Sequence, residues 1–224
     1  MTKCLSSDPY DNIAPWYDPV TAWALAGTRI RMVELCRENG WRNVLDIGCG
    51  TGMQVGLLKN AGIRCCGFDA SSAMLAVARE RLPPGFPLVL GALPLPFADR
   101  FFDAAILSLL LHETDSEPEE LLREALRVAP ACVVLEWRKP ERILELPGLI
   151  MMRFIERLAG DRHYARFRAY SKNGWLPGIA ARAGASVVSE APVCGGLLSL
   201  AVLSLMENIP PLRGSGQCRL MPAT

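Results

Sequence analysis

The sequence has almost no net charge and no apolar run long enough to span a membrane. Its 24 basic and 23 acidic side chains leave a formal charge of +1, which gives no overall attraction to nucleic acid or to an anionic membrane. The longest uncharged run, residues 191–206, is shorter than the roughly 20 apolar residues of a membrane span and is interrupted by Pro192. The first residues also lack the apolar core of a signal peptide. We therefore predict a cytoplasmic protein with no stable membrane insertion and no nucleic-acid partner.

Cysteine is plentiful, but the spacing typical of thiol metal sites and redox motifs is missing. None of the eight cysteines forms a CxxC pair, and several lie within apolar runs. Such thiols are typical of buried positions in a protein of a reducing compartment. The sequence therefore predicts neither disulfides nor metal ligands.

One stretch, Leu45-Asp46-Ile47-Gly48-Cys49-Gly50-Thr51-Gly52, has the pattern of a ligand-binding turn. A short apolar run ends in three glycines at every second position, and a helical pattern follows, which indicates a buried strand that turns tightly into a helix. Glycine permits positive φ and has no Cβ, so a ligand can lie on the backbone where the N–H groups of the helix start converge. Asp46 adds a carboxylate at the edge of this turn. The stretch therefore predicts a cofactor cradle.

The remaining sequence alternates between strand and helix patterns. This alternation predicts βαβ units in a doubly wound, mostly parallel α/β sheet with helices on both faces. The last two strands have no helix between them, so we expect them to pair antiparallel at one edge of the sheet. Strands are predicted at residues 43–47, 64–68, 87–90, 102–110, 131–135, 185–191 and 197–205, and helices at 18–39, 53–61, 72–82, 116–128, 146–159 and 173–183.

A single domain with an insertion accounts for the length of the chain. Asp18-Pro19 is a good start for the first helix. The segments are an N-terminal lid and helix (1–40), a cofactor-binding core (41–139), an inserted helical segment that forms the acceptor pocket (140–184), a closing strand pair (185–207) and a flexible tail (208–224).

The glycine pattern discriminates between cofactors. A dinucleotide fingerprint, GxGxxG, needs a third glycine where this chain has Met53, whereas here the third glycine is Gly52. Asp69, at the end of the second strand, can accept hydrogen bonds from both hydroxyls of a ribose. The phosphate-loop motif GxxxxGK[ST] is absent, which argues against ATP. The pattern favours a mononucleoside cofactor.

These residues resemble the class I S-adenosylmethionine-dependent methyltransferases, including small-molecule members that act on quinone precursors. The resemblance rests on residues 44–52, on Gly67-Phe68-Asp69-Ala70-Ser71 with Met74, on residues 95–103 and on residues 124–130. It implies a Rossmann-like, seven-stranded sheet whose last strand is inserted antiparallel, in agreement with the strand pair inferred above. It also implies S-adenosyl-L-methionine as methyl donor and S-adenosyl-L-homocysteine as product.

The resemblance also assigns cofactor contacts. Asp46 would orient the methionine end of the cofactor, and Asp69 would hold its ribose. Ala92 stands where the family often has an acidic or amide side chain for the adenine, so adenine would depend on backbone and packing contacts. Tyr17 would either shield the sulfonium with its ring face or be a core aromatic residue. The remaining implied contacts are Gly48, Cys49, Gly50, Ala70, Met74 and Leu93.

Three polar residues follow strands four and five, at the sheet edge where ligands of open α/β sheets bind. His112, Glu113 and Glu136 are therefore candidate catalytic residues, and each is otherwise a helix-start or loop residue that bonds to backbone. His163 lies in the inserted segment that should roof the acceptor pocket. The basic stretch 153–172 either recognises an acidic substrate or an anionic membrane surface, or is a solvated helix face, and the last interpretation is favoured.

The sequence predicts an S-adenosylmethionine-dependent methyltransferase that acts at O, C or N of a small apolar or aromatic acceptor. The predicted helix 146–159 is amphipathic, with Arg153, Glu156 and Arg157 on its polar side. Its apolar positions within residues 146–158 favour such a pocket. Two alternatives remain: a noncatalytic S-adenosylmethionine-binding protein, and an NAD-dependent oxidoreductase, which Met53 disfavours. The acceptor and the oligomeric state are not determined by the sequence.

Overall fold

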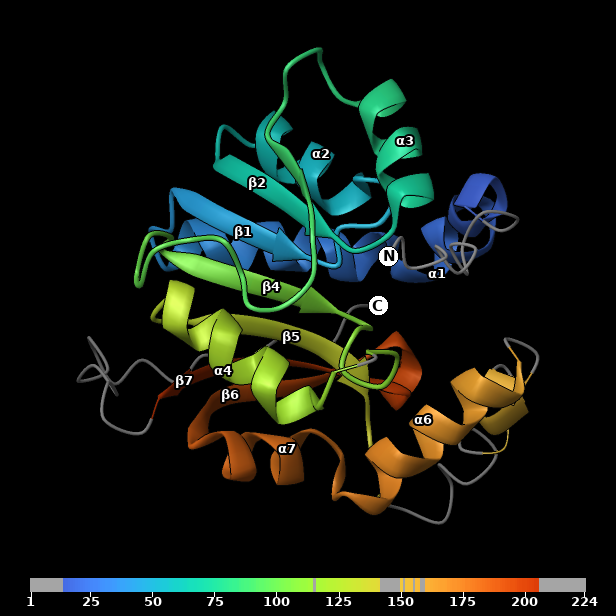
Figure 1. Cartoon of the computed structure of the whole chain (residues 1–224). Helices are drawn as coiled ribbons and strands as arrows, with labels where there is room; N and C mark the ends of the chain where they lie inside the picture. Colours follow the sequence, from blue (N-terminus) through green and yellow to red (C-terminus); the bar gives the residue numbers. More distant parts are fainter. Residues whose placement is uncertain are drawn as a thin grey trace, which may run out of the picture.

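The computed structural model describes residues 14–114, 116–141, 150, 152–154, 156–157 and 160–205, with backbone alone for 14–24 (Figure 1). The predicted lid before residue 14, most of the predicted helix 146–159 and the predicted tail 208–224 lie outside the described residues, as does the side chain of Tyr17. Among the described residues, no helix has the length and apolar character needed to cross a membrane.

A seven-stranded sheet in the order β3-β2-β1-β4-β5-β7-β6 forms the centre of the structure (Figure 1). β7 runs antiparallel to both of its neighbours, and the pairs from β3 to β5 are all parallel. The predicted doubly wound sheet with an inserted antiparallel last strand is therefore confirmed. The strands are β1 Asn43–Ile47, β2 Arg64–Asp69, β3 Leu88–Leu90, β4 Ala104–Ser108, β5 Cys132–Trp137, β6 Ala185–Val193 and β7 Leu198–Leu205.

Helices cover both faces of the sheet. α1 packs with α2 and α3, while α4 packs with α7. Because strand order runs outward from β1 in one direction and from β4 in the other, right-handed crossovers place α2 and α3 on one face and α4 on the opposite face. The helices are α1 Ala14–Glu38, α2 Met53–Asn60, α3 Ser72–Arg81, α4 Pro118–Val128, α6 Asp161–Lys172 and α7 Trp175–Ala183, and a short 3-10 helix η2 spans Cys194–Gly196.

Several predicted boundaries were wrong. α1 already begins at Ala14 rather than at Asp18, which puts Pro15 in the first helical turn, where a missing N–H is tolerated. β4 ends at Ser108 although the apolar run continues, because Leu109 has φ +54° and turns the chain away from the sheet. The basic stretch 153–172 is predicted as a helix face without bounds, and the structure places the helix α6 at Asp161–Lys172.

The loop after β3 is held in place by one arginine. The guanidinium of Arg127 donates to the carbonyl oxygens of Leu95 (2.9 Å) and Phe97 (2.8 Å). The carboxylate of Glu124 accepts from the backbone N–H of Leu95 (2.8 Å) and from Arg127. These contacts fix the loop that starts at Gly91, next to the end of β2.

Candidate functional site

The predicted cradle is a strand-to-helix turn with three glycines in the left-handed region. Gly48, Gly50 and Gly52 have φ of +71°, +52° and +77°. A Cβ on Gly52 would lie 3.1 Å from side-chain atoms of Ala78 and Leu82, so this glycine lets α2 pack against α3. A Cβ on Gly50 would meet nothing within 4 Å. Gly50 therefore presents its backbone to open space, as contact with a ligand requires.

Asp69 joins the cradle to the start of α3. Its carboxylate accepts from the backbone N–H of Gly50 (2.7 Å) and of Ser71 (2.8 Å). The backbone carbonyl of Asp69 accepts from Gly91 N–H (3.0 Å), which brings the loop after β3 to the same point. Asp69 is only half-buried, so its carboxylate is held rigidly at an accessible strand end.

Asp46 is buried at the end of β1 with an unsatisfied oxygen. The residue is 1% exposed, and its Oδ1 accepts no hydrogen bond from the described residues. Burial raises the pKa of this carboxyl to about 7, with a further contribution from the charge of Asp69, while Arg29 acts in the opposite direction. A ligand amino group would satisfy this oxygen, so the open cradle at Gly50 and the orphaned carboxylate of Asp46 fit S-adenosylmethionine.

The residues predicted beside the adenine lie around the end of β2. Ala70 and Ala92 are exposed and Leu93 is half-buried, so this side of the site is open. Met74 is 4% exposed and belongs to the core. Burial raises the pKa of the Cys49 thiol far above its usual range, so this thiol stays protonated in the cradle.

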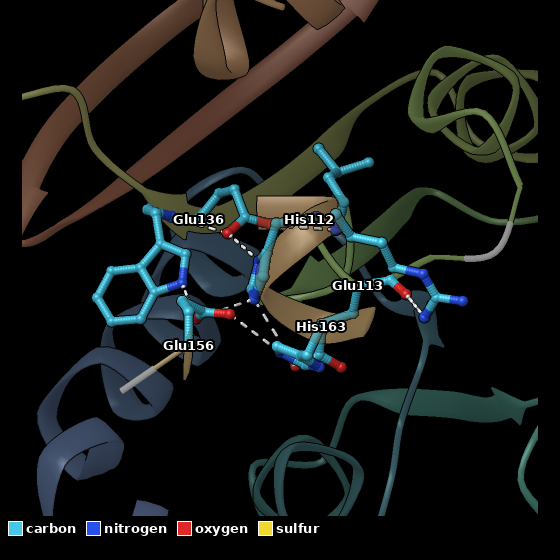
Figure 2. A network of polar contacts seen from close by, with 8 residues as sticks. His112, Glu113, Glu136, Glu156 and His163 are labelled. Carbon is cyan, nitrogen blue, oxygen red and sulfur yellow. Dashed lines mark hydrogen bonds and ion pairs between the residues drawn. The ribbon is translucent and has the colours of Figure 1, made fainter. Parts of the chain in front are cut away.

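A second polar group lies at the ends of β4 and β5. The structure brings the three predicted residues His112, Glu113 and Glu136 together with Glu156 and His163 (Figure 2). His112 and Glu113 follow β4, Glu136 lies in β5, and His163 comes from α6. Glu156, which the sequence placed on a polar helix face, is 3% exposed, so that expectation was wrong. We call these five residues the His/Glu cluster.

Glu136 determines the orientation of His112. Its carboxylate accepts from the backbone N–H groups of Leu111 (3.0 Å), His112 (3.3 Å) and Trp137 (2.8 Å), and its Oε1 lies 2.6 Å from Nδ1 of His112. An ionised carboxylate can only accept hydrogen bonds, so Nδ1 carries the hydrogen. Nε2 of His112 therefore faces the other side of the cluster.

Glu156 contacts both imidazoles (Figure 2). Its Oε1 accepts from the indole N–H of Trp137 at 2.6 Å and lies 3.5 Å from Nε2 of His112. Its Oε2 lies 3.1 Å from Nε2 of His163 but accepts no hydrogen bond of good geometry from the described residues. Glu113 also contacts both histidines. Its Oε1 lies 3.7 Å from Nε2 of His112 and 3.4 Å from Nε2 of His163.

The carboxylates favour protonated imidazoles. Burial alone lowers the pKa of His112, but the charge and hydrogen bond of Glu136, with Glu113 and Glu156, outweigh it and raise that pKa to about 9. The adjacent carboxylates of Glu113 and Glu156 raise the pKa of His163 to about 10 against a smaller effect of burial. Without a ligand, both histidines carry positive charge at neutral pH.

Aromatic residues enclose the His/Glu cluster. The ring centroids of Trp137 and Tyr170 each lie 6.2 Å from that of His112, and Phe167 lies at 6.5 Å. The hydroxyl of Tyr170 donates to the backbone carbonyl of Trp137 (2.9 Å), which ties α6 to the end of β5. Arg166 of α6 also donates to the carbonyl of Glu113 (2.6 Å). The α6 segment therefore covers the ends of β4 and β5.

The comparisons with known proteins agree with the cradle. Residues 45–130 match the model of a methyltransferase domain family. A demethylmenaquinone methyltransferase of Thermotoga maritima is 38% identical over 125 residues, which are 53% of this chain and 54% of that protein. A second demethylmenaquinone methyltransferase, of Renibacterium salmoninarum, is 33% identical over 138 residues, 58% of each chain. The chain thus spans about half the length of the curated relatives it matches.

Solved structures share the fold at low sequence identity. A chain in the complex between the Haloferax volcanii Trm112 methyltransferase activator and a methyltransferase superposes with a TM-score of 0.62 at 16% identity, covering 89% of this chain and 98% of that one. An O-methyltransferase family protein of Burkholderia thailandensis gives a TM-score of 0.64 at 18% identity, covering 86% and 59%.

Proposed function

We propose that the chain is a class I S-adenosylmethionine-dependent methyltransferase that methylates a small hydroxylated aromatic acceptor of the quinone-precursor type, because residues 45–130 match a methyltransferase domain family. Two relatives carry the name demethylmenaquinone methyltransferase, and this name motivates the acceptor class. The observation that carries the proposal is the pairing of an open glycine cradle with a polar cluster, surrounded by aromatic side chains, at neighbouring strand ends.

The cofactor half of the proposal rests on three residues of the chain. Gly50 offers its backbone to open space, Asp69 holds a carboxylate at the end of β2, and Asp46 has a buried oxygen that accepts no hydrogen bond from the described residues. When bound, S-adenosylmethionine supplies a methyl group on a positively charged sulfur. We assign Asp46 to its amino group and Asp69 to its ribose hydroxyls.

The acceptor half rests on the His/Glu cluster and its aromatic wall. β4 lies beside β1, so the segment that follows β4 ends at the same sheet edge as the cradle. Ligands of open α/β sheets bind at that edge. Phe167 and Tyr170 are buried beside His112. The surroundings of the cluster are therefore aromatic, which suits an aromatic acceptor better than a charged one.

The polar residues divide the work of activating a hydroxyl group. The raised pKa of His112 keeps that imidazole protonated at neutral pH, so it stabilises negative charge on an acceptor oxygen rather than removing a proton. Glu113, which is half-buried, is the group that we assign to proton removal. Glu136 is a positioning residue, because it acts through the ring of His112.

Calorimetric titration of the purified chain with S-adenosylmethionine and, separately, with NAD tests the cofactor assignment. We expect binding of the first alone, and binding of NAD alone would refute the proposal. Incubation with methyl-labelled cofactor and demethylmenaquinol or simpler dihydroxyarenes, followed by mass spectrometry, tests the acceptor class. Label transfer to none of these acceptors by a chain that binds the cofactor would favour the noncatalytic alternative.

A Glu113→Gln variant tests the assigned base. We expect cofactor affinity to stay unchanged and turnover of a hydroxyl acceptor to fall by about 100-fold or more, the typical contribution of a general base. Wild-type turnover in this variant would remove Glu113 from the mechanism.

A further inference from the structure

We propose that His112, His163 and Glu156 form a binding site for a divalent transition-metal ion, with Nε2 of each histidine and the carboxylate as ligands. The three ligand atoms lie within 4.8 Å of one another. The chain contains two histidines in all, and both meet here although they come from different elements. Two imidazoles and one carboxylate are a ligand set that proteins use for Zn²⁺ and Fe²⁺.

The spacing of the atoms is compatible with a shared ion. Ligands about 2.1 Å from a tetrahedral ion lie about 3.4 Å from one another. His112 Nε2 lies 3.5 Å from Oε1 of Glu156, and His163 Nε2 lies 3.1 Å from Oε2 of the same carboxylate. Glu113 lies at 3.7 Å and 3.4 Å from the same two nitrogens, so it can approach the ion as well.

Hydrogen bonds with neighbouring side chains orient two of the proposed ligands, His112 and Glu156, as in known metal centres. Glu136 binds Nδ1 of His112 and so directs Nε2 inward, an arrangement in which a carboxylate orients a metal-binding histidine. The indole N–H of Trp137 holds Oε1 of Glu156 at 2.6 Å. This leaves Oε2 of Glu156, on a side chain that is 3% exposed, with no hydrogen bond of good geometry from the described residues. A buried carboxylate oxygen without a hydrogen bond, beside the imidazole nitrogen of His163, is an independent observation that points to a cation at this place.

The charges are consistent with a cation. Glu113, Glu136 and Glu156 bring three carboxylates to one partly enclosed site, and the two imidazoles stand opposite them. Such a charge excess in a buried place is compensated either by protons on both rings or by a metal ion that replaces those protons. Binding of a metal ion at Nε2 of His112 would leave the hydrogen bond between Nδ1 of this histidine and Glu136 unchanged.

The location suggests what the ion would bind. Three protein ligands leave a tetrahedral ion with an open position, as in catalytic zinc sites. On the proposed function, and only if it holds, that position lies at the acceptor end of the sheet and would take the hydroxyl oxygen of the acceptor, with Glu113 beside it to receive the proton. The ion would then replace the protonated ring of His112 as the group that stabilises negative charge on this oxygen. The metal site itself rests on the five side chains and does not depend on that function.

The test uses the full chain after treatment with EDTA and removal of the chelator. Titration with Co²⁺, followed by visible absorption, and with Zn²⁺, followed by calorimetry, should give one ion per chain. The Co²⁺ spectrum should lack the intense near-ultraviolet band of thiolate ligands, which separates this site from the eight cysteines. We expect His163→Gln and Glu156→Gln to weaken Zn²⁺ binding by more than about 100-fold, and Glu136→Gln by about 10- to 100-fold.

Arg168→Gln is the matched control, because Arg168 lies on α6 with His163 but is exposed and outside the cluster. It should bind Zn²⁺ as the wild type does. His163 is the more accessible histidine, with 20% of its side chain exposed, so its variant keeps the test valid if a His112 variant does not fold. No stoichiometric Zn²⁺ in the wild type, or equal affinity in His163→Gln, would overturn the metal site. Cofactor binding, measured on the same samples, reports on the proposed function separately.

Discussion

Oε1 of Glu136 lies 2.6 Å from Nδ1 of His112, and both side chains are almost completely buried. The same carboxylate accepts three backbone N–H groups, so its position is fixed by the ends of β4 and β5 rather than by the histidine. The tautomer and the ring orientation of His112 therefore follow from the sheet itself. Any role of this histidine, in catalysis or in metal binding, depends on that contact.

Replacing Glu136 by Gln should lower the pKa of His112 by about one unit or more from its value of about 9. The substitution removes the nearest negative charge while it keeps the shape of the side chain. Because the chain has only two histidines, NMR titration of the metal-free protein can resolve both rings. His163 provides the internal control, since its pKa depends on Glu113 and Glu156. An unchanged pKa at His112 would show that Glu136 does not control its charge.

The stability of the metal-free protein should fall as the pH rises from 7 to 10. Both histidines have a higher pKa in the folded chain than the usual 6.5, so the folded state holds more protons than the unfolded one in this range. Their stabilisation is complete below about pH 6.5 and is lost as the pH passes 9 to 10. Urea unfolding at several pH values in EDTA should show a loss of about 1–3 kcal/mol across this window.

The His163→Gln variant should flatten that profile, while Arg168→Gln should leave its slope unchanged. The introduced glutamine side chain does not titrate, so one of the two proton-linked contributions disappears. Equal slopes in both variants would mean that other groups cause the pH dependence.

Asp46→Asn should stabilise the unliganded protein above pH 7 and weaken cofactor binding. Burial raises the pKa of this carboxyl to about 7 in the folded state. As the pH rises, the folded protein must ionise a buried group, which costs free energy. The stability that the protonated form contributes is therefore lost between about pH 4 and 7. The amide avoids this cost. Thermal melting at pH 8 should rise by about 2–4 °C for each kcal/mol recovered.

The same variant should bind S-adenosylmethionine at least about 10-fold more weakly, because an amide offers the ligand's amino group no negative charge. Calorimetry measures this directly. A variant that is more stable and binds equally well would show that Asp46 serves packing alone.

The cradle could be predicted from sequence because its determinants are local. Three glycines after an apolar strand determine the turn. Asp69 ends the next strand along the chain, β2, which pairs directly with β1 in the sheet. The sheet order was implied by the resemblance and confirmed. The placement of His112, Glu113 and Glu136 at one sheet edge followed from the rule that parallel strands end together.

The rest of the His/Glu cluster could not be predicted, because it depends on how the inserted segment folds back. Glu156 looked like a solvent-facing residue between Arg153 and Arg157, and no local pattern shows that Trp137 binds its carboxylate. α6 is rich in charge, so its sequence resembles an exposed stretch although Phe167 and Tyr170 are buried. Without that helix, His163 had no predicted partner.

A pair of glycine variants separates the ligand role of the cradle from its structural role. Both Gly50→Ala and Gly52→Ala place a Cβ at positive φ, which costs about 1–2 kcal/mol. At Gly50 the methyl group meets no protein atom within 4 Å, so the remaining effect should be on the bound cofactor, with affinity reduced at least about 10-fold. At Gly52 it would press on Ala78 and Leu82, so Gly52→Ala should unfold at a clearly lower temperature. Thermal melting and calorimetric titration of both variants give the comparison. If Gly50→Ala binds S-adenosylmethionine as the wild type does while Gly52→Ala shows the expected loss of stability, the cofactor does not lie on the backbone of Gly50.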